Sequence, residues 1–114
     1  MSHAIDATDA NFGDTVRRSD TPTLVDFWAP WCGPCRLLGP VVDRVAEQYA
    51  DHLRVVRVDV DTSPALAQAH GVRSIPTLIL FKGGEPVARI VGLVSFDDLA
   101  SRLDAELGMS NAAA

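Results

Sequence analysis

Apolar residues recur at helical spacing in the two longest patterned stretches of the chain. One stretch follows a pair of cysteines, and its side chains three and four positions apart predict a long amphipathic helix: Leu37, Leu38, Val41, Val42, Val45 and Tyr49. Pro40 lies within this stretch and is expected to kink the helix. The other stretch predicts a helix over residues 96–107, which Ser95 caps and Gly108 ends.

Two shorter helices are also predicted. Near the N-terminus, Thr8 is placed to cap a helix that runs to about Arg18, with Phe12 and Val16 four positions apart as its buried pair. Further along, residues 64–70 fit a helix of about two turns that begins with a proline. The second of these helices is expected to lie between β-strands.

Short runs rich in β-branched and apolar residues separate these helices and predict strands at residues 23–28, 53–60, 77–81 and 87–91. The last two runs flank a Lys-Gly-Gly segment at residues 82–84. Since glycine tolerates positive φ, this segment predicts a hairpin with antiparallel strands. The order of elements therefore predicts an α/β fold, with a βαβ half followed by a ββα half.

Composition limits the size and the partners of the protein. The 114 residues, 47% of them hydrophobic, suit a single domain, expected over residues 1–108 with a short flexible tail at 109–114. The net charge is -5, and acidic and basic residues are interspersed, so no nucleic-acid partner is expected. The first residues lack a secretory signal and no run is long enough to span a membrane, so we expect a cytoplasmic protein.

The candidate chemistry lies in Trp31-Cys32-Gly33-Pro34-Cys35, between a predicted strand and the long helix. Cys32 is expected near the helix N-terminus, where free N–H groups and the helix dipole favour a thiolate. Thiolate attacks disulfides, so Cys32 is the predicted nucleophile and Cys35, one turn further in, the resolving thiol. Gly33 would let another backbone approach, and Pro34 would fix φ in the first turn.

Three alternatives compete with this interpretation. A C-x-x-C pair is half of a zinc site, but the remaining ligands would have to come from His3, His52 and His70, which lack the usual spacing, so no metal is expected. A structural disulfide closing so short a loop would remove little entropy from the unfolded chain. Two inert buried cysteines would not explain the tryptophan and the Gly-Pro insert beside them.

Several motifs together resemble those of bacterial thioredoxins over about residues 5–107. They are LVDFWAPWCGPC at residues 24–35, Pro40, the Ile-Pro-Thr of residues 75–77, Gly84 and Gly92. C-x-x-C beside a βαβ pattern is itself a known signature of this family, so it restates the resemblance and adds no independent evidence. The resemblance implies the thioredoxin fold, with a central mixed sheet of about five strands flanked by about four helices.

The resemblance also implies a surface for client proteins. Pro76 is expected in a cis peptide bond facing the two sulfurs, and the backbone of Ile75 is expected to pair with an extended client segment. The surrounding residues would be Trp31, Gly33, Pro34, Ser74, Val91 and Gly92. For Trp31 and Val91 the alternative is ordinary packing within the fold.

Asp26 is conspicuous because it lies in the apolar run at residues 23–28. Burial would raise its pKa, whereas a solvent-facing carboxylate on an edge strand is the alternative. In the family, the matching carboxylate is proposed to accept the proton of the resolving thiol, here Cys35. Many relatives carry lysine at Arg57, and the arginine here would either pair with Asp26 and tune its pKa or form a surface ion pair with Asp59 or another acid.

The resemblance implies a general protein-disulfide reductase with no cofactor of its own. Electrons would arrive from NADPH through a flavoprotein thioredoxin reductase, and clients would include ribonucleotide reductase, peroxiredoxins and methionine sulfoxide reductase. A monomer is expected, because the sequence shows no large second apolar face. The alternatives are an oxidant or isomerase, which usually carries histidine where Pro34 stands, and a binding module whose thiols are incidental.

Overall fold

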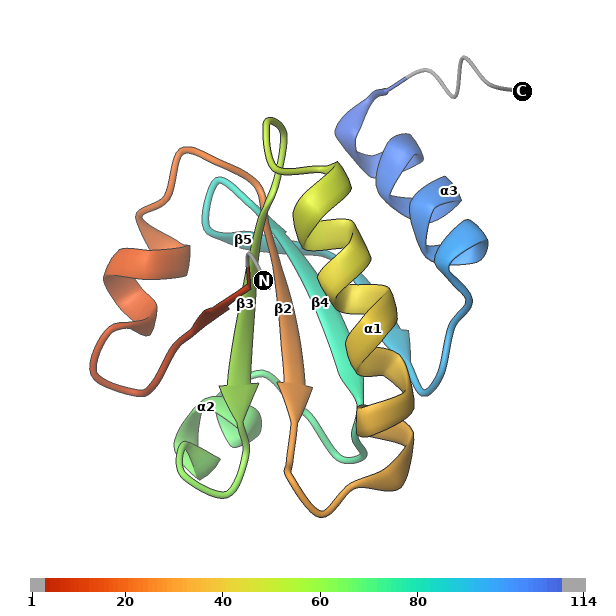
Figure 1. Ribbon diagram of the computed structural model, residues 1–114. Helices are drawn as coiled ribbons and strands as arrows, with labels where there is room; N and C mark the ends of the chain where they lie inside the picture. Colours follow the sequence, from red (N-terminus) through yellow and green to blue (C-terminus); the bar gives the residue numbers. More distant parts are fainter. Residues whose placement is uncertain (1–3, 110–114) are drawn as a thin grey trace.

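A computed structural model describes residues 4–109, and in them five strands form one mixed sheet (Figure 1). Its strands lie in the order β1-β3-β2-β4-β5. The neighbours β1–β3 and β3–β2 are parallel, whereas β2–β4 and β4–β5 are antiparallel. The strands are β1 (Ile5–Asp6), β2 (Thr23–Trp28), β3 (Arg54–Asp59), β4 (Thr77–Lys82) and β5 (Glu85–Val91). The predicted order and the antiparallel hairpin are confirmed.

Four helical elements of the described residues flank this sheet, and the expected fold is confirmed. They are a π-helical segment η1 (Gly13–Arg17) and the α-helices α1 (Gly33–Gln48), α2 (Pro64–Ala69) and α3 (Phe96–Leu107). In Figure 1, α1 and α3 lie on one side of the sheet, and α2 and the N-terminal segment lie on the other. The sheet is therefore covered on both faces.

Alternation along the strands divides the interior into two cores. On one face, Leu24 and Leu78 pack with residues of α1 and α3. On the other face, Val25 and Ile79 pack with Phe12 and with residues of α2. Because successive strand residues point to opposite faces, Asp26 shares the face of Leu24, which α1 covers.

The caps of α3 form as predicted. The Ser95 Oγ accepts a hydrogen bond from the Asp98 N–H at 3.1 Å, which satisfies one free donor at the N-terminus of the helix. Gly108 ends the helix with φ at 68°, a left-handed conformation that glycine adopts without a steric cost. In α1, the chain remains helical through Pro40.

The prediction for the N-terminal segment was confirmed at its cap and wrong in two other respects. Thr8 Oγ1 accepts the Ala10 N–H at 3.3 Å and the Thr8 carbonyl accepts the Phe12 N–H at 3.0 Å, so Thr8 caps the first turn as predicted. The helical segment itself, however, runs only over Gly13–Arg17 and is π-helical. Phe12 and Val16 are nevertheless both buried, as predicted. The two-residue strand β1 was not predicted, since so short a segment carries no periodicity.

The last residue that the structure describes, Met109, lies just beyond α3. Met109 donates its N–H to the Asp104 carbonyl at 2.8 Å and packs against the core on the α1 side. The remainder of the predicted tail, residues 110–114, lies outside the described residues. Within the described chain, no helix has the length and apolar character needed to cross a membrane.

The turn between β4 and β5 packs against the N-terminal segment through Gly84. This residue has φ at 80°, and a Cβ there would overlap the Arg17 carbonyl oxygen. Its neighbour Gly83 has φ at 60°, but a Cβ there would meet nothing within 4 Å. The two glycines therefore separate the cost of positive φ from the cost of close packing.

We expect Gly83→Ala to lower the free energy of unfolding by about 1 kcal/mol, the cost of positive φ alone. Gly84→Ala should lose about 1–3 kcal/mol more, because the new methyl group displaces the backbone at Arg17. Urea denaturation of both variants measures the difference. Equal losses would show that the contact at Arg17 adds nothing.

Candidate active site

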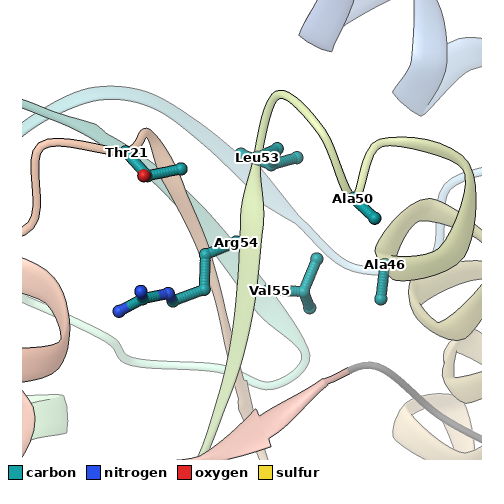
Figure 2. A pocket seen from close by; sticks show the side chains of 6 residues that line it. All are labelled: Thr21, Ala46, Ala50, Leu53, Arg54 and Val55. Carbon is teal, nitrogen blue, oxygen red and sulfur yellow. The ribbon is translucent and has the colours of Figure 1, made fainter.

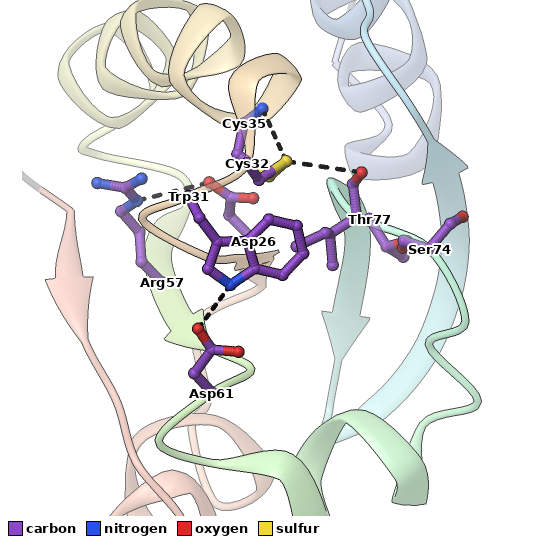
Figure 3. The surroundings of a disulfide bond; sticks show 9 residues. Asp26, Trp31, Cys32, Cys35, Arg57, Asp61, Ser74 and Thr77 are labelled. Atoms are coloured by element: carbon purple, nitrogen blue, oxygen red, sulfur yellow. Dashed lines mark hydrogen bonds and ion pairs between the residues drawn. A yellow bond between two sulfur atoms is a disulfide. The ribbon is translucent and has the colours of Figure 1, made fainter.

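Cys32 and Cys35 form a disulfide bond at the N-terminus of α1, with their Cα atoms 5.2 Å apart (Figure 3). Cys32 caps this helix, and its Sγ accepts the Cys35 N–H at 3.2 Å. Donors and the positive end of the helix dipole therefore point at the Cys32 sulfur. Cys32 is 4% exposed and Cys35 1%, so Cys32 is the outer member of the pair.

The residues between the cysteines shape the first turn of α1. Pro34 lies in that turn, where its missing N–H deprives no helical hydrogen bond. A Cβ at Gly33 would meet nothing within 4 Å. No backbone segment of this chain therefore approaches Gly33 closely, although the sequence led us to expect such an approach. The open space at Gly33 is thus on the outer surface of the site.

A cis peptide bond joins Ile75 to Pro76 beside the disulfide, as the resemblance implies. The carbonyl oxygen of Ile75 lies 3.8 Å from the Cys32 Sγ. On the other side of Pro76, its carbonyl accepts the Gly92 N–H at 2.9 Å, and Val91 pairs with Thr77 in the sheet. The structure therefore places Ile75 beside Cys32 and joins Val91 and Gly92 to the residues that follow it.

The side chain of Trp31 stands outward beside the cysteines (Figure 3). It is 67% exposed, which rules out ordinary core packing, and its Nε1 donates to Asp61 Oδ2 at 2.7 Å. Val91 is also largely exposed. Sequence reasoning missed Asp61, although it follows β3 and the cysteines follow β2. Since these strands are parallel, both segments must lie at the same edge of the sheet.

A shallow apolar pocket of about 180 Å³ lies beside Trp31. Three predicted surface residues line it together with four that the sequence reasoning missed: Trp31, Ser74 and Ile75, and Val60, Ala67, Val72 and Arg73. The missed residues come from α2 and the two loops beside it, and a surface assembled from three separate segments leaves no periodic signal. Gly33, Pro34, Val91 and Gly92 are not part of the pocket lining.

Asp26 is buried, with 1% of its surface exposed, on the face of β2 that α1 covers. The register pairs it with Arg57 on β3, and Asp26 Oδ2 lies 3.5 Å from Arg57 Nε (Figure 3). Burial raises the pKa of Asp26 from 3.8 to about 6, although the Arg57 charge opposes this rise. The two open alternatives are thereby decided: Asp26 is internal, and Arg57 pairs with Asp26.

Arg57 is held by a second partner. Its guanidinium carbon lies 4.2 Å from the ring centre of Trp28, a distance at which a cation and an aromatic face attract each other. A planar guanidinium stacks on such a ring, and it keeps its charge at every ordinary pH. Arg57 therefore places a permanent positive charge between Asp26 and Trp28.

A second hollow, of about 270 Å³, lies where α1 ends (Figure 2). Its lining includes Ala46, Ala50 and Arg54, and it contains no cysteine. Since Cys32 caps the opposite end of α1, this hollow is not part of the site. The described residues also contain no group of three or more His, Cys, Asp or Glu side chains placed to hold a metal ion.

Known proteins are similar to this chain over nearly its whole length. Thioredoxin 1 of Synechococcus elongatus is 52% identical over 107 residues, which cover 94% of this chain and 100% of that protein. Thioredoxin 1 of Nostoc sp. is 50% identical with the same coverage, 94% and 100%. The family model described as Thioredoxin matches residues 3–105. The chain belongs to the thioredoxin family.

Thioredoxins are thiol-disulfide oxidoreductases, and this chain carries the active-site cysteine pair in the disulfide form. It thus acts by dithiol-disulfide exchange. The family implies a reductase partner and disulfide-containing clients. A bifunctional thioredoxin reductase/thioredoxin of Mycobacterium leprae is 52% identical over 88 residues, which cover 77% of this chain and 19% of that protein.

The raised pKa of Asp26 makes the stability of the fold depend on pH. Below pH 3.8 the Asp26 carboxyl is neutral in the folded and in the unfolded chain, so folding buries no charge there. This contribution to the free energy of unfolding is lost as the pH rises through about 6. Asp26→Asn should therefore match the parent chain near pH 3.5 and exceed its free energy of unfolding by about 3 kcal/mol at pH 8.

Urea denaturation between pH 3.5 and 8 measures this difference. Asp51→Asn, at an exposed carboxylate in the turn after α1, is the control and should show no such trend. A gain in Asp26→Asn that stays constant with pH would contradict the expectation.

Proposed function

We propose that this chain is a general protein-disulfide reductase in which Cys32 attacks and Cys35 resolves. The observation that carries the assignment is the position of Cys32. It caps α1, its Sγ accepts the Cys35 N–H, and it is the more exposed residue of the pair. Such an environment favours the thiolate at Cys32 over the thiolate at Cys35.

The reaction starts from the dithiol form. The Cys32 thiolate attacks one sulfur of the client disulfide, the client S–S bond breaks, and the departing client sulfur takes up a proton. Cys35 then loses its proton and attacks the Cys32 sulfur of the mixed disulfide, which releases the second client thiol. The client gains two electrons and two protons, and the chain ends with the Cys32–Cys35 disulfide that the structure contains.

Asp26 is the proposed acceptor of the Cys35 proton. It lies on the face of β2 that α1 covers, and Cys35 is in the first turn of α1. A pKa of about 6 suits proton transfer near neutral pH better than an ordinary carboxyl does. Arg57 limits this rise of the pKa and thereby tunes the acceptor. Gly33, Pro34 and Pro76 set the geometry of the two sulfurs.

The client is proposed to dock on Trp31, Ser74, Ile75, Pro76, Val91 and Gly92. The outward tryptophan and the pocket beside it support apolar contacts with the client. The backbone of Ile75, close to the Cys32 Sγ, supports pairing with an extended client segment. Backbone pairing with few side-chain demands would admit many clients.

The proposed electron source is NADPH, through a separate flavoprotein thioredoxin reductase. The printed name of the Mycobacterium leprae relative joins these two functions in one protein, which supports such a pairing. Proposed clients are ribonucleotide reductase, peroxiredoxins and methionine sulfoxide reductase. We further propose a cytoplasmic monomer whose single domain spans residues 1–108, with no bound cofactor.

Cys35→Ser should trap the first intermediate, because the resolving thiol is missing. Incubation with a disulfide-containing protein such as insulin should yield a covalent adduct on Cys32, detected by intact-mass spectrometry and released by dithiothreitol. Cys32→Ser is the matched control and should form no adduct. An adduct on Cys32→Ser alone would reverse the assigned order of the two thiols.

The reduction potential tests the direction of the reaction. We expect about -270 mV, the value known for thioredoxins, in a titration followed by the fluorescence of Trp28 and Trp31. A value between about -180 and -120 mV would instead identify an oxidant or isomerase and would argue against the cytoplasm.

A further inference from the structure

His70 occupies an aromatic enclosure on the face of the sheet opposite α1. It follows α2 directly, and its ring centre lies 5.3 Å from that of Phe12, 6.0 Å from Phe27 and 5.4 Å from Phe81. These three rings belong to the segment before η1, to β2 and to β4. The imidazole therefore contacts three parts of the fold at once.

The polar atoms of His70 also have defined partners. Its Nδ1 lies 3.0 Å from the Leu66 carbonyl oxygen, and since a carbonyl only accepts, Nδ1 must carry the proton. The same oxygen accepts the backbone N–H of His70 at 3.2 Å. Arg89 of β5 donates to the His70 carbonyl. His70 thereby closes the C-terminus of α2 and ties it to the sheet.

The segment that follows His70 reaches the disulfide within a few residues. Gly71 turns the chain with φ at 66°, and the Val72 N–H bonds to the Ala67 carbonyl at 2.9 Å. Residues 72–75 have no regular secondary structure, yet they line the pocket beside Trp31. Their position is held at one end by His70 and the Val72 bond to α2, and near the other end by the Thr77 hydroxyl, which donates to the Ser74 carbonyl at 2.6 Å.

We propose that His70 is a positioning residue for client docking, because its ring and its Nδ1–H fix the end of α2 from which residues 71–75 reach Cys32. The inference rests on the proposed docking surface. The ring contacts and the Nδ1–H bond are separate contributions. Phenylalanine at this position would keep the ring contacts without the hydrogen bond, and glutamine would keep a donor without the ring.

The test separates docking from thiol chemistry by the choice of substrate. Dithiothreitol supplies the electrons for insulin, and for the small disulfide the chain is reduced beforehand and freed of dithiothreitol, so no reductase is needed. Insulin is the protein disulfide that must dock, and 5,5′-dithiobis(2-nitrobenzoate) is a small disulfide that needs only an accessible Cys32 thiolate. We expect His70→Ala to raise the KM for insulin roughly tenfold, with kcat unchanged, since loosened residues 71–75 weaken binding and not the exchange step.

Conservative variants keep the test usable if His70→Ala does not fold. His70→Phe should restore most of the affinity for insulin and leave the KM about threefold above that of the parent chain. The KM of His70→Gln should lie between those of His70→Phe and His70→Ala. The rate with the small disulfide should stay at the parent value in all three. Hydrogen exchange of the amides at residues 71–75 should accelerate in the same order.

Tyr49→Phe is the matched control. It removes the hydrogen bond from the Tyr49 hydroxyl to Asp104 Oδ1, at 2.7 Å, which joins α1 to α3 far from residues 71–75. It should leave the KM for insulin unchanged. A parent KM in every folded His70 variant, or an equal rise in Tyr49→Phe, would overturn the proposal. Failure of the parent chain to reduce the small disulfide would instead contradict the proposed function itself.

Discussion

The chemistry of this chain depends on one constraint: a long helix begins directly where a fully covered central strand ends. β2 lies between β3 and β4 and is packed on both faces, so its end is fixed relative to the sheet. The turn that follows must then place Cys32 at the first free donors of α1. The cis bond at Pro76, which precedes β4 beside β2, arrives at the same edge because these strands are neighbours.

The same packing sets the electrostatics of the site. A carboxylate within an apolar strand is expensive to keep charged, and the register places Arg57 directly beside it. The ion pair is long, and the arginine is shared with the Trp28 ring, so compensation of the buried charge is incomplete. Asp26 thereby keeps its proton up to about pH 6, roughly two pH units above an exposed carboxyl, and is largely a carboxylate at neutral pH. Burial and pairing act in opposite directions here, and burial dominates.

The hydrophobic pattern predicted segments that bury one face or both faces. The bounds of β2 and α3 agree with the prediction because a short apolar run marks the strand and two caps mark the helix. The cap at Thr8 could be predicted from the residue type, whereas the π-helical form of Gly13–Arg17 leaves no distinct mark in the spacing of apolar residues. Asp61 and Arg73 escaped notice because their places at the site follow from tertiary contacts. The cysteines were found because their chemistry is written in adjacent residues.

The direction of α1 and α3 has a consequence for how the molecule is joined to others. Both helices run away from the edge that holds Cys32, so α3 ends at the opposite pole of the sheet (Figure 1). A domain attached beyond Gly108 would therefore be tethered on the far side from Trp31 and Ile75. The edge that holds Cys32 stays accessible to large proteins when the chain is attached at the C-terminal end of α3. This arrangement suits fusion to another domain and immobilisation on a surface.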